Sequence, residues 1–137
     1  MHLTFFIPGN PKALKRHRAV RRRGHVGSYD PSRADKADLV AKCIMLRPAR
    51  PIEEPVRLQL VLQFPRPKSH YGKAGLKAHA PRFHTSKPDS SNVLKLIEDA
   101  LNGIFWRDDA LICQHQVTKV YSETPGIQIT ITPAETT

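Results

Sequence analysis

Apolar and polar residues alternate most regularly between positions 56 and 64. The apolar residues of this run fall on every second position: Val56, Leu58, Leu60, Leu62 and Phe64. A period of two places all of them on one face of a β-strand. Shorter β-prone runs at 2–7, 110–121 and 126–132 predict three further strands.

Two other stretches repeat their apolar residues every three or four positions, which is the spacing of a helix. The first covers 32–47; it starts at Ser32, a residue type that favours helix starts, and ends before Pro48. The second covers 91–103 and ends at Gly103. The order of elements predicts a single α+β domain over 1–137, with a mixed or antiparallel sheet and two main helices packed on one side.

The segments 9–31 and 65–88 show neither period and are rich in proline and glycine. We predict that both are loops, and that they are mobile. Connections of this length are usually functional or disordered. Tyr71 and Phe83 lie in the second segment, where an aromatic ring either stacks on an unpaired base or packs against the domain.

Positive charge is concentrated in the same two segments. The chain has 22 Lys and Arg against 12 Asp and Glu, a net charge of +10, with seven cations between 12 and 23 and six between 66 and 87. Such a surplus indicates a polyanionic partner, although a merely solvated positive surface is the alternative. The predicted DNA-phosphate contacts are Lys15, Arg16, Arg18, Arg21, Arg22, Arg23, Lys68, Lys73, Lys77, Arg82 and Lys87.

Composition also excludes several classes of protein. No apolar run is long enough to span a membrane, so no membrane partner is expected. Cys43 and Cys113 are 70 positions apart and form no CxxC motif, which excludes a disulfide scaffold and a four-cysteine zinc site. We therefore expect a cytoplasmic protein.

Acidic residues are concentrated in one short segment. Five of the 12 lie within 21 positions: Asp89, Glu98, Asp99, Asp108 and Asp109. Mg²⁺ needs one or two carboxylates with waters and phosphate, and Asp89 with Asp109 or Asp108 would suffice. The spacing alone leaves a structural alternative open, in which Asp89 caps a helix, Lys95 and Asp99 form a surface pair, and the last two acids occupy a turn.

The block KPDSSNVLKLIEDALNGIFWRDD resembles the signature of the RusA family of Holliday-junction resolvases, K-P-D-x-D-N-L-x-K-x-x-x-D-A-L-N-G followed by an aromatic residue and D-D. The upstream IPGNPKALKR is similar to the first strand and basic loop of that family. The resemblance implies a Mg²⁺-dependent endodeoxyribonuclease, with Mn²⁺ as a substitute ion. It also implies a homodimer that resolves four-way DNA junctions in recombination and repair, associated with the nucleoid.

The resemblance also assigns roles to individual residues. Asp89 falls on the first metal-binding aspartate, Lys95 on the catalytic lysine and Asp109 on the aspartate that closes the metal site. Asp108 matches the first acid of the terminal pair. Asp99 matches the acid of DALNG, and its place along the helix makes a structural role the simpler interpretation.

One position departs from the family pattern. Ser91 stands where the family has a second metal-binding aspartate. A neutral hydroxyl binds a divalent ion poorly, so Ser91 would act through a water or only as a helix cap. We therefore expect reduced activity, with an inactive junction-binding protein as the first alternative and a nuclease for flaps or forks as the second.

Overall fold

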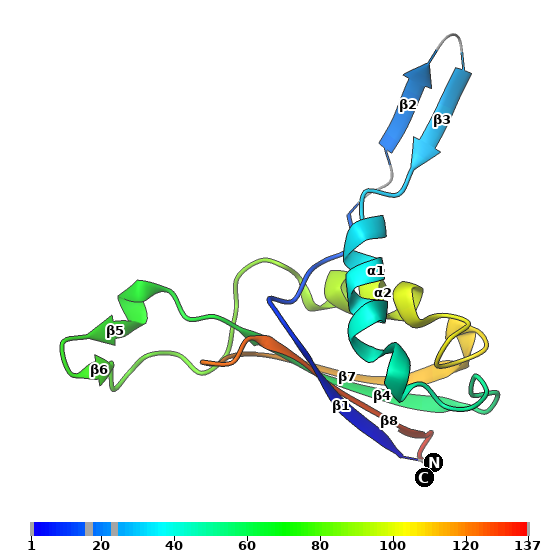
Figure 1. Cartoon of the computed structure of the whole chain (residues 1–137). Helices are drawn as coiled ribbons and strands as arrows, with labels where there is room; N and C mark the ends of the chain where they lie inside the picture. The colour runs from blue at the N-terminus through cyan, green and yellow to red at the C-terminus, as the bar shows by residue number, and fades with distance from the viewer. Residues whose placement is uncertain (1, 16–17, 23–24, 137) are drawn as a thin grey trace.

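The computed structural model describes residues 2–15, 18–22 and 25–136, and it describes no side chain between 16 and 28. Four strands of the described chain form one sheet: β1 (Leu3–Pro8), β8 (Gly126–Pro133), β4 (Val56–Phe64) and β7 (Ile112–Tyr121), in that spatial order (Figure 1). β8 runs antiparallel to both β1 and β4, whereas β7 runs parallel to β4. The sheet is therefore mixed.

Two α-helices lie on one side of this sheet (Figure 1). α1 (Arg33–Cys43) continues into the short 3₁₀ helix η1 (Ile44–Leu46). α2 (Ser90–Leu101) lies between β4 and β7 in the chain and supplies the crossover that a parallel pair requires. The predicted α+β fold with two helices on one side is confirmed. No helix among the described residues combines the length and apolar character of a membrane span.

The core lies between the sheet and the helices. The five alternating apolar residues of β4 are buried, as their period predicts. α2 covers them with an apolar side whose buried members are Val93, Leu96, Ile97, Ala100 and Leu101. Trp106, just beyond α2, is fully buried beside them. This contact fixes the rotation of α2, so that its polar side faces away from the sheet.

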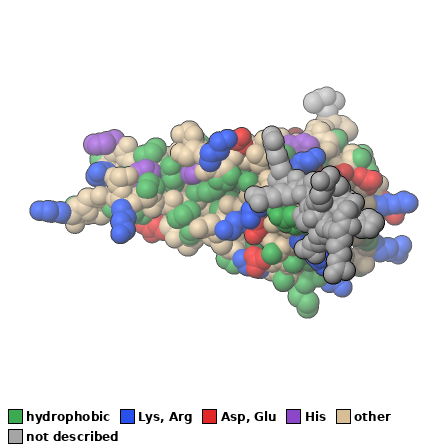
Figure 2. All heavy atoms as spheres, turned by 90° about the horizontal axis from the view of Figure 1, so that it is seen from above, with side chains coloured by type: hydrophobic (Ala, Val, Ile, Leu, Met, Phe, Trp, Pro, Cys, Tyr) green, Lys and Arg blue, Asp and Glu red, His purple; other side chains and the backbone are tan. Residues whose placement is uncertain are grey.

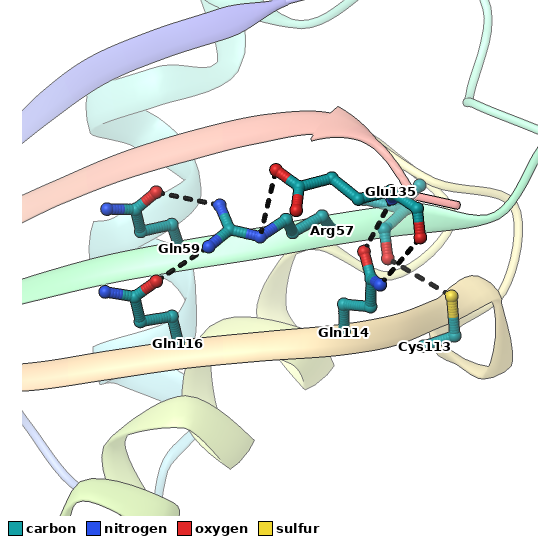
Figure 3. A network of polar contacts seen from close by, with 7 residues as sticks. Arg57, Gln59, Cys113, Gln114, Gln116 and Glu135 are labelled. Carbon is teal, nitrogen blue, oxygen red and sulfur yellow. Dashed lines mark hydrogen bonds and ion pairs between the residues drawn. The ribbon is translucent and has the colours of Figure 1, made fainter. Parts of the chain in front are cut away.

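The other face of the sheet carries a network of polar contacts between Arg57, three glutamines and the C-terminal segment (Figure 3). The Arg57 guanidinium donates hydrogen bonds to Gln59 Oε1 at 2.9 Å and to Gln116 Oε1 at 2.7 Å. The Gln114 side chain exchanges two hydrogen bonds with the backbone of Glu135. This network holds the C-terminal segment against the sheet.

The prediction that 9–31 is a loop is wrong, because this segment contains the strands β2 (Arg18–Arg22) and β3 (His25–Tyr29). They pair only with each other, as a hairpin that projects from the start of α1 (Figure 1). Their sequences, RAVRR and HVGSY, do not alternate apolar and polar residues, so they lack the period that identifies β4. We call β2 and β3 the hairpin arm.

Backbone hydrogen bonds attach the base of the hairpin arm to both helices. The Lys15 N–H donates to the hydroxyl of buried Ser32 at 2.7 Å, and the Leu14 N–H donates to the Asn92 carbonyl of α2 at 3.0 Å. Ser32 occupies the predicted N-cap position of α1 but makes no capping bond with its side chain. Its hydroxyl holds the arm instead.

The second predicted loop, 65–88, is largely irregular, as expected. It contains the 3₁₀ turn η2 (Lys68–His70) and the two-residue strands β5 (Tyr71–Gly72) and β6 (Gly75–Leu76). We call residues 65–88 the tongue; it leaves the sheet at the end opposite the chain termini (Figure 1).

Aromatic contacts fasten the root of the tongue to the sheet. The His84 ring stacks on Phe64 with centroids 3.9 Å apart and meets Tyr121 edge-on at 5.1 Å. The backbone N–H of His84 donates to the Lys119 carbonyl at 3.0 Å. Among the described residues, Nδ1 of the His84 ring is buried without a hydrogen-bond partner. Burial, and then the charge of Lys119, lower the pKa of His84. The folded protein therefore holds this imidazole neutral.

Acidification should weaken this attachment. Above the ordinary pKa of 6.5 His84 is neutral in both the folded and unfolded states; below it the unfolded chain takes up a proton that the folded state resists. We expect the melting temperature to fall as pH drops from about 7.5 to about 5.5, with faster amide exchange at the tongue root. His84→Phe, which keeps the stack but cannot titrate, should reduce this dependence.

The matched control is His79→Phe, because His79 is exposed on the same tongue. An equal pH dependence of melting in the wild type and in His84→Phe would show that this imidazole does not control the attachment.

Candidate active site

The polar side of α2 presents the predicted site residues to solvent. Ser91 is exposed in its first turn, and Lys95 is exposed one turn further along. Asn92, Lys95 and Asp99 recur at intervals of three and four residues, so they share one side of the helix. That side is opposite the apolar residues that contact β4.

Asp89 occupies the N-cap position of α2 but does not cap it. Its backbone is extended, and its side chain accepts no capping hydrogen bond. The carboxylate lies 3.4 Å from the ammonium of Lys87, and both side chains are exposed. An exposed ion pair of this kind contributes little stability. The Asp89 carboxylate is thus accessible to another cation.

Asp108 and Asp109 begin the 3₁₀ turn η3 (Asp109–Leu111), directly before β7. The Asp108 carboxylate accepts a hydrogen bond from the Ala110 N–H at 2.9 Å. Partial burial of Asp109 raises its pKa, and so do its hydrogen bond with Asp108 and the negative charges of Asp108 and Asp99. Lys95 acts in the opposite direction. The charges of Asp99, Asp108 and Lys95 therefore all act on the Asp109 carboxylate.

Asp99 is also held from the other helix. The ammonium of Lys36 in α1 lies 3.9 Å from the Asp99 carboxylate and 2.7 Å from that of Asp30, next to the hairpin arm. Asp99 thus has the structural partner that its place in the helix suggested, while its charge also acts on Asp109. No sequence pattern predicts the role of Lys36, because contacts between two helices leave no local pattern.

Asp89 and Asp109 make no direct contact within the described residues. Six positions separate Asp89 from Lys95, a rise of about 9 Å along a helix, so Lys95 lies along α2 between Asp89 and the Asp99–Asp109 neighbourhood. Among the described residues, no three His, Cys, Asp or Glu side chains are close enough to hold one ion together. That Asp89 and Asp109 share an ion stays a prediction.

The donor chemistry nevertheless fits a hard cation. Carboxylate oxygens are the ligands that Mg²⁺ prefers, and it commonly binds one or two of them with waters and phosphate completing the shell. The pKa of Asp109 is raised first by its burial, then by its hydrogen bond with Asp108 and by repulsion from the carboxylates of Asp108 and Asp99. A bound cation would relieve this repulsion.

The predicted DNA contacts of the hairpin arm are only partly described. Arg16 and Arg23 lie outside the described residues, and for Arg18, Arg21 and Arg22 the structure gives the backbone position in β2 alone. Lys15 at the base of the arm is exposed, with its ammonium 3.8 Å from Asp35.

The tongue presents its predicted contacts to solvent. Figure 2 shows basic and histidine side chains at this narrow end of the molecule. The five predicted contacts are all exposed: Lys68, Lys73, Lys77, Arg82 and Lys87. The tongue leads directly into Asp89. Leu14, which precedes the hairpin arm, donates its backbone N–H to the Asn92 carbonyl. Both cationic segments therefore join the molecule beside the start of α2.

Removal of the Asp109 charge should stabilise the protein without metal. Because the surroundings disfavour its charged form, we expect Asp109→Asn to raise the melting temperature at neutral pH in metal-free buffer. Saturating Mg²⁺ should raise the melting temperature of the wild type more than that of the variant.

The control is Glu123→Gln, an exposed acid in the turn between β7 and β8. A lower melting temperature for Asp109→Asn than for the wild type would contradict the repulsion. An equal Mg²⁺ effect in the two proteins would place the ion elsewhere.

Two comparisons relate this chain to known proteins. Residues 8–132 match the family described as endodeoxyribonuclease RusA. An uncharacterized protein of Bacillus subtilis, YqaN, is 31% identical over 134 residues, which cover 94% of each chain. The family match takes in both helices, β4, β7, the tongue and the acidic residues. The chain belongs to the RusA endodeoxyribonuclease family.

Proposed function

We propose that this protein is a Mg²⁺-dependent endodeoxyribonuclease that resolves four-way DNA junctions in recombination and repair, with Mn²⁺ as an alternative ion. The observation that carries the proposal is that the charges of Asp99, Asp108 and Lys95 all act on Asp109, in a molecule whose two cationic segments join it beside the start of α2. A phosphodiesterase needs a cation and a phosphate in one place. Carboxylates attract the first, and the hairpin arm and tongue attract the second.

Each site residue has a chemical role in this proposal. Asp89, from the start of α2, and Asp109 would hold the ion, and Ser91 would reach it through a water. Bound Mg²⁺ supplies a water of lowered pKa and neutralises phosphate charge. The Lys95 ammonium stabilises the negative charge that grows on the phosphate oxygens.

The hairpin arm and the tongue supply affinity for DNA of any sequence. Their Lys and Arg side chains contact backbone phosphates, so binding depends strongly on salt. A homodimer fits the substrate, because two equivalent sites related by two-fold symmetry face two opposed strands of the junction. Such a protein would work in the cytoplasm at the nucleoid, where its DNA substrate lies.

Ser91 favours a second candidate function. With one carboxylate fewer than the family pattern, the protein binds branched DNA and cuts it slowly or not at all. The two candidates share the fold and the DNA-binding surface. They differ only in the rate of the chemical step, which a cleavage assay measures directly.

Asp89→Asn should abolish cutting and spare binding. We expect cleavage of a synthetic four-way junction to fall roughly 10²-fold or more, the usual cost of removing a group that stabilises transition-state charge. The dissociation constant for the junction should stay within about twofold, since DNA affinity comes from the arms. Cleavage is followed on gels with and without Mg²⁺, on junction, flap and fork substrates.

Asp38→Asn is the control, since Asp38 pairs with Lys42 on α1 and belongs to no proposed site. Full cleavage by Asp89→Asn would remove Asp89 from the site. Faster cutting of flaps or forks than of junctions would assign a different substrate.

Ser91→Asp should raise activity by restoring a negative ligand. The added carboxylate increases Mg²⁺ affinity, so the variant should cut junctions faster and reach half its maximal rate at a lower Mg²⁺ concentration. Ser90→Asp places the same charge in the same helical turn and controls for the favourable effect of an acid at a helix start. Equal effects of both substitutions, or none, would show that Ser91 does not occupy a ligand position.

A further inference from the structure

An exposed apolar pair forms the tip of the tongue. Tyr71 on β5 and Leu76 on β6 are direct partners across the small hairpin. Directly opposed residues of an antiparallel pair lie on the same face. Their exposed fractions are 38% and 51%, so two large apolar side chains stand together in solvent.

The positive charge around Tyr71 and Leu76 indicates the kind of partner that they can bind. The tongue contains six cations and no acid, and two of these cations, Lys73 and Lys77, lie in and next to the small hairpin. A partner that fits must offer negative charge and a flat apolar surface at short range. DNA offers both, as phosphates and as base faces.

The tongue is braced from within. The Lys77 N–H donates to the His70 carbonyl at 2.9 Å, and the His70 ring meets Tyr121 of β7 edge-on at 4.8 Å. The Arg66 guanidinium donates to the Pro81 carbonyl at 2.7 Å and lies 5.3 Å from the Tyr121 ring. These contacts join both limbs of the tongue to the sheet, so little conformational freedom is lost when the tip binds.

A braced apolar tip distinguishes branched DNA from duplex DNA. In a continuous duplex the base faces are stacked on one another and covered. At a branch point the stack is interrupted, and apolar side chains can pack on the exposed faces. The cations, in contrast, contact the phosphates of any DNA.

We propose that Tyr71 and Leu76 form a wedge that packs on bases at the branch point and gives this protein its preference for branched over duplex DNA. The wedge rests on the proposed function for its substrate, but it acts in binding and not in cleavage. The wedge determines where on the DNA the protein binds before any strand is cut.

The test compares two double variants of the full chain. Tyr71→Ser with Leu76→Ser removes the wedge; Met45→Ser with Leu46→Ser removes two exposed apolar side chains from η1, away from the tongue. Dissociation constants are measured for a four-way junction and for a duplex of the same sequence, in EDTA so that no cleavage occurs. The wedge variant should bind the junction about tenfold more weakly and the duplex unchanged, the loss expected for one base–aromatic stack.

A second measurement locates the contact. The fluorescent base 2-aminopurine is placed either at the branch point or within one arm of the junction. Wild-type protein should change the fluorescence at the branch and not in the arm, and the wedge variant should change neither. Tyr71→Phe keeps the ring and should behave as the wild type.

Several results would overturn the wedge. Equal weakening of junction and duplex binding would make the pair a general DNA contact, and unchanged binding of both would remove it from the DNA surface. A wild type that does not prefer the junction, or whose binding leaves the branch-point fluorescence unchanged, would also overturn it. Failure of the proposed function appears separately, as absence of cleavage in Mg²⁺ by a protein that still binds branches selectively.

Discussion

The contact between the apolar side of α2 and the buried face of β4 is the constraint on which the rest of the structure depends. Val93, Ile97 and Leu101 are fully buried in the same core cluster as the inward side chains of β4. Each such side chain contributes roughly 1.5–3 kcal/mol by leaving water. Because this contact fixes the rotation of the helix, Lys95 and Asp99 must face outward. The site is thus positioned by apolar residues that take no part in its chemistry.

The same contact explains which parts of the molecule could be predicted from sequence. β4 and α2 bury one side each, so apolar residues recur at every second position in β4 and about every 3.6 positions in α2. Both elements lie where this pattern predicts them. Among the described strands, β2 and β3 pair with each other alone, and their sequences do not alternate apolar and polar residues, so the pattern predicts a loop there. Ser32 shows a related limit: its type predicted a cap, but the Lys15 N–H, 17 positions away, uses its hydroxyl.

The candidate site was predictable in its members more than in its arrangement. The resemblance to the family motif assigns roles to Asp89, Lys95 and Asp109 through their order in the chain, and these roles stay predictions. The grouping of Asp109 with Asp99 depends on how η3 returns beside α2, which no local pattern contains. For the same reason, the ion pair of Lys36 with Asp99 and the stacking of His84 on Phe64 appear only when distant segments meet. Tertiary contacts of this kind decide electrostatics, and the sequence does not record them locally.

Charge separation within one small domain resolves a conflict that any phosphodiesterase of this type faces. The carboxylates that attract a divalent cation also repel a phosphate, and the +10 chain offsets this by placing 13 of its 22 cations in two segments beside the acids. The segments need not touch the acids to act, because fields of exposed charges extend about 8–10 Å at physiological salt. Lys87 and Lys95, interleaved with the acids, act at shorter range. In the proposed site, a neutral residue at Ser91 would shift this balance toward phosphate attraction and away from cation binding, so that tighter DNA binding and slower cutting would follow from the same substitution.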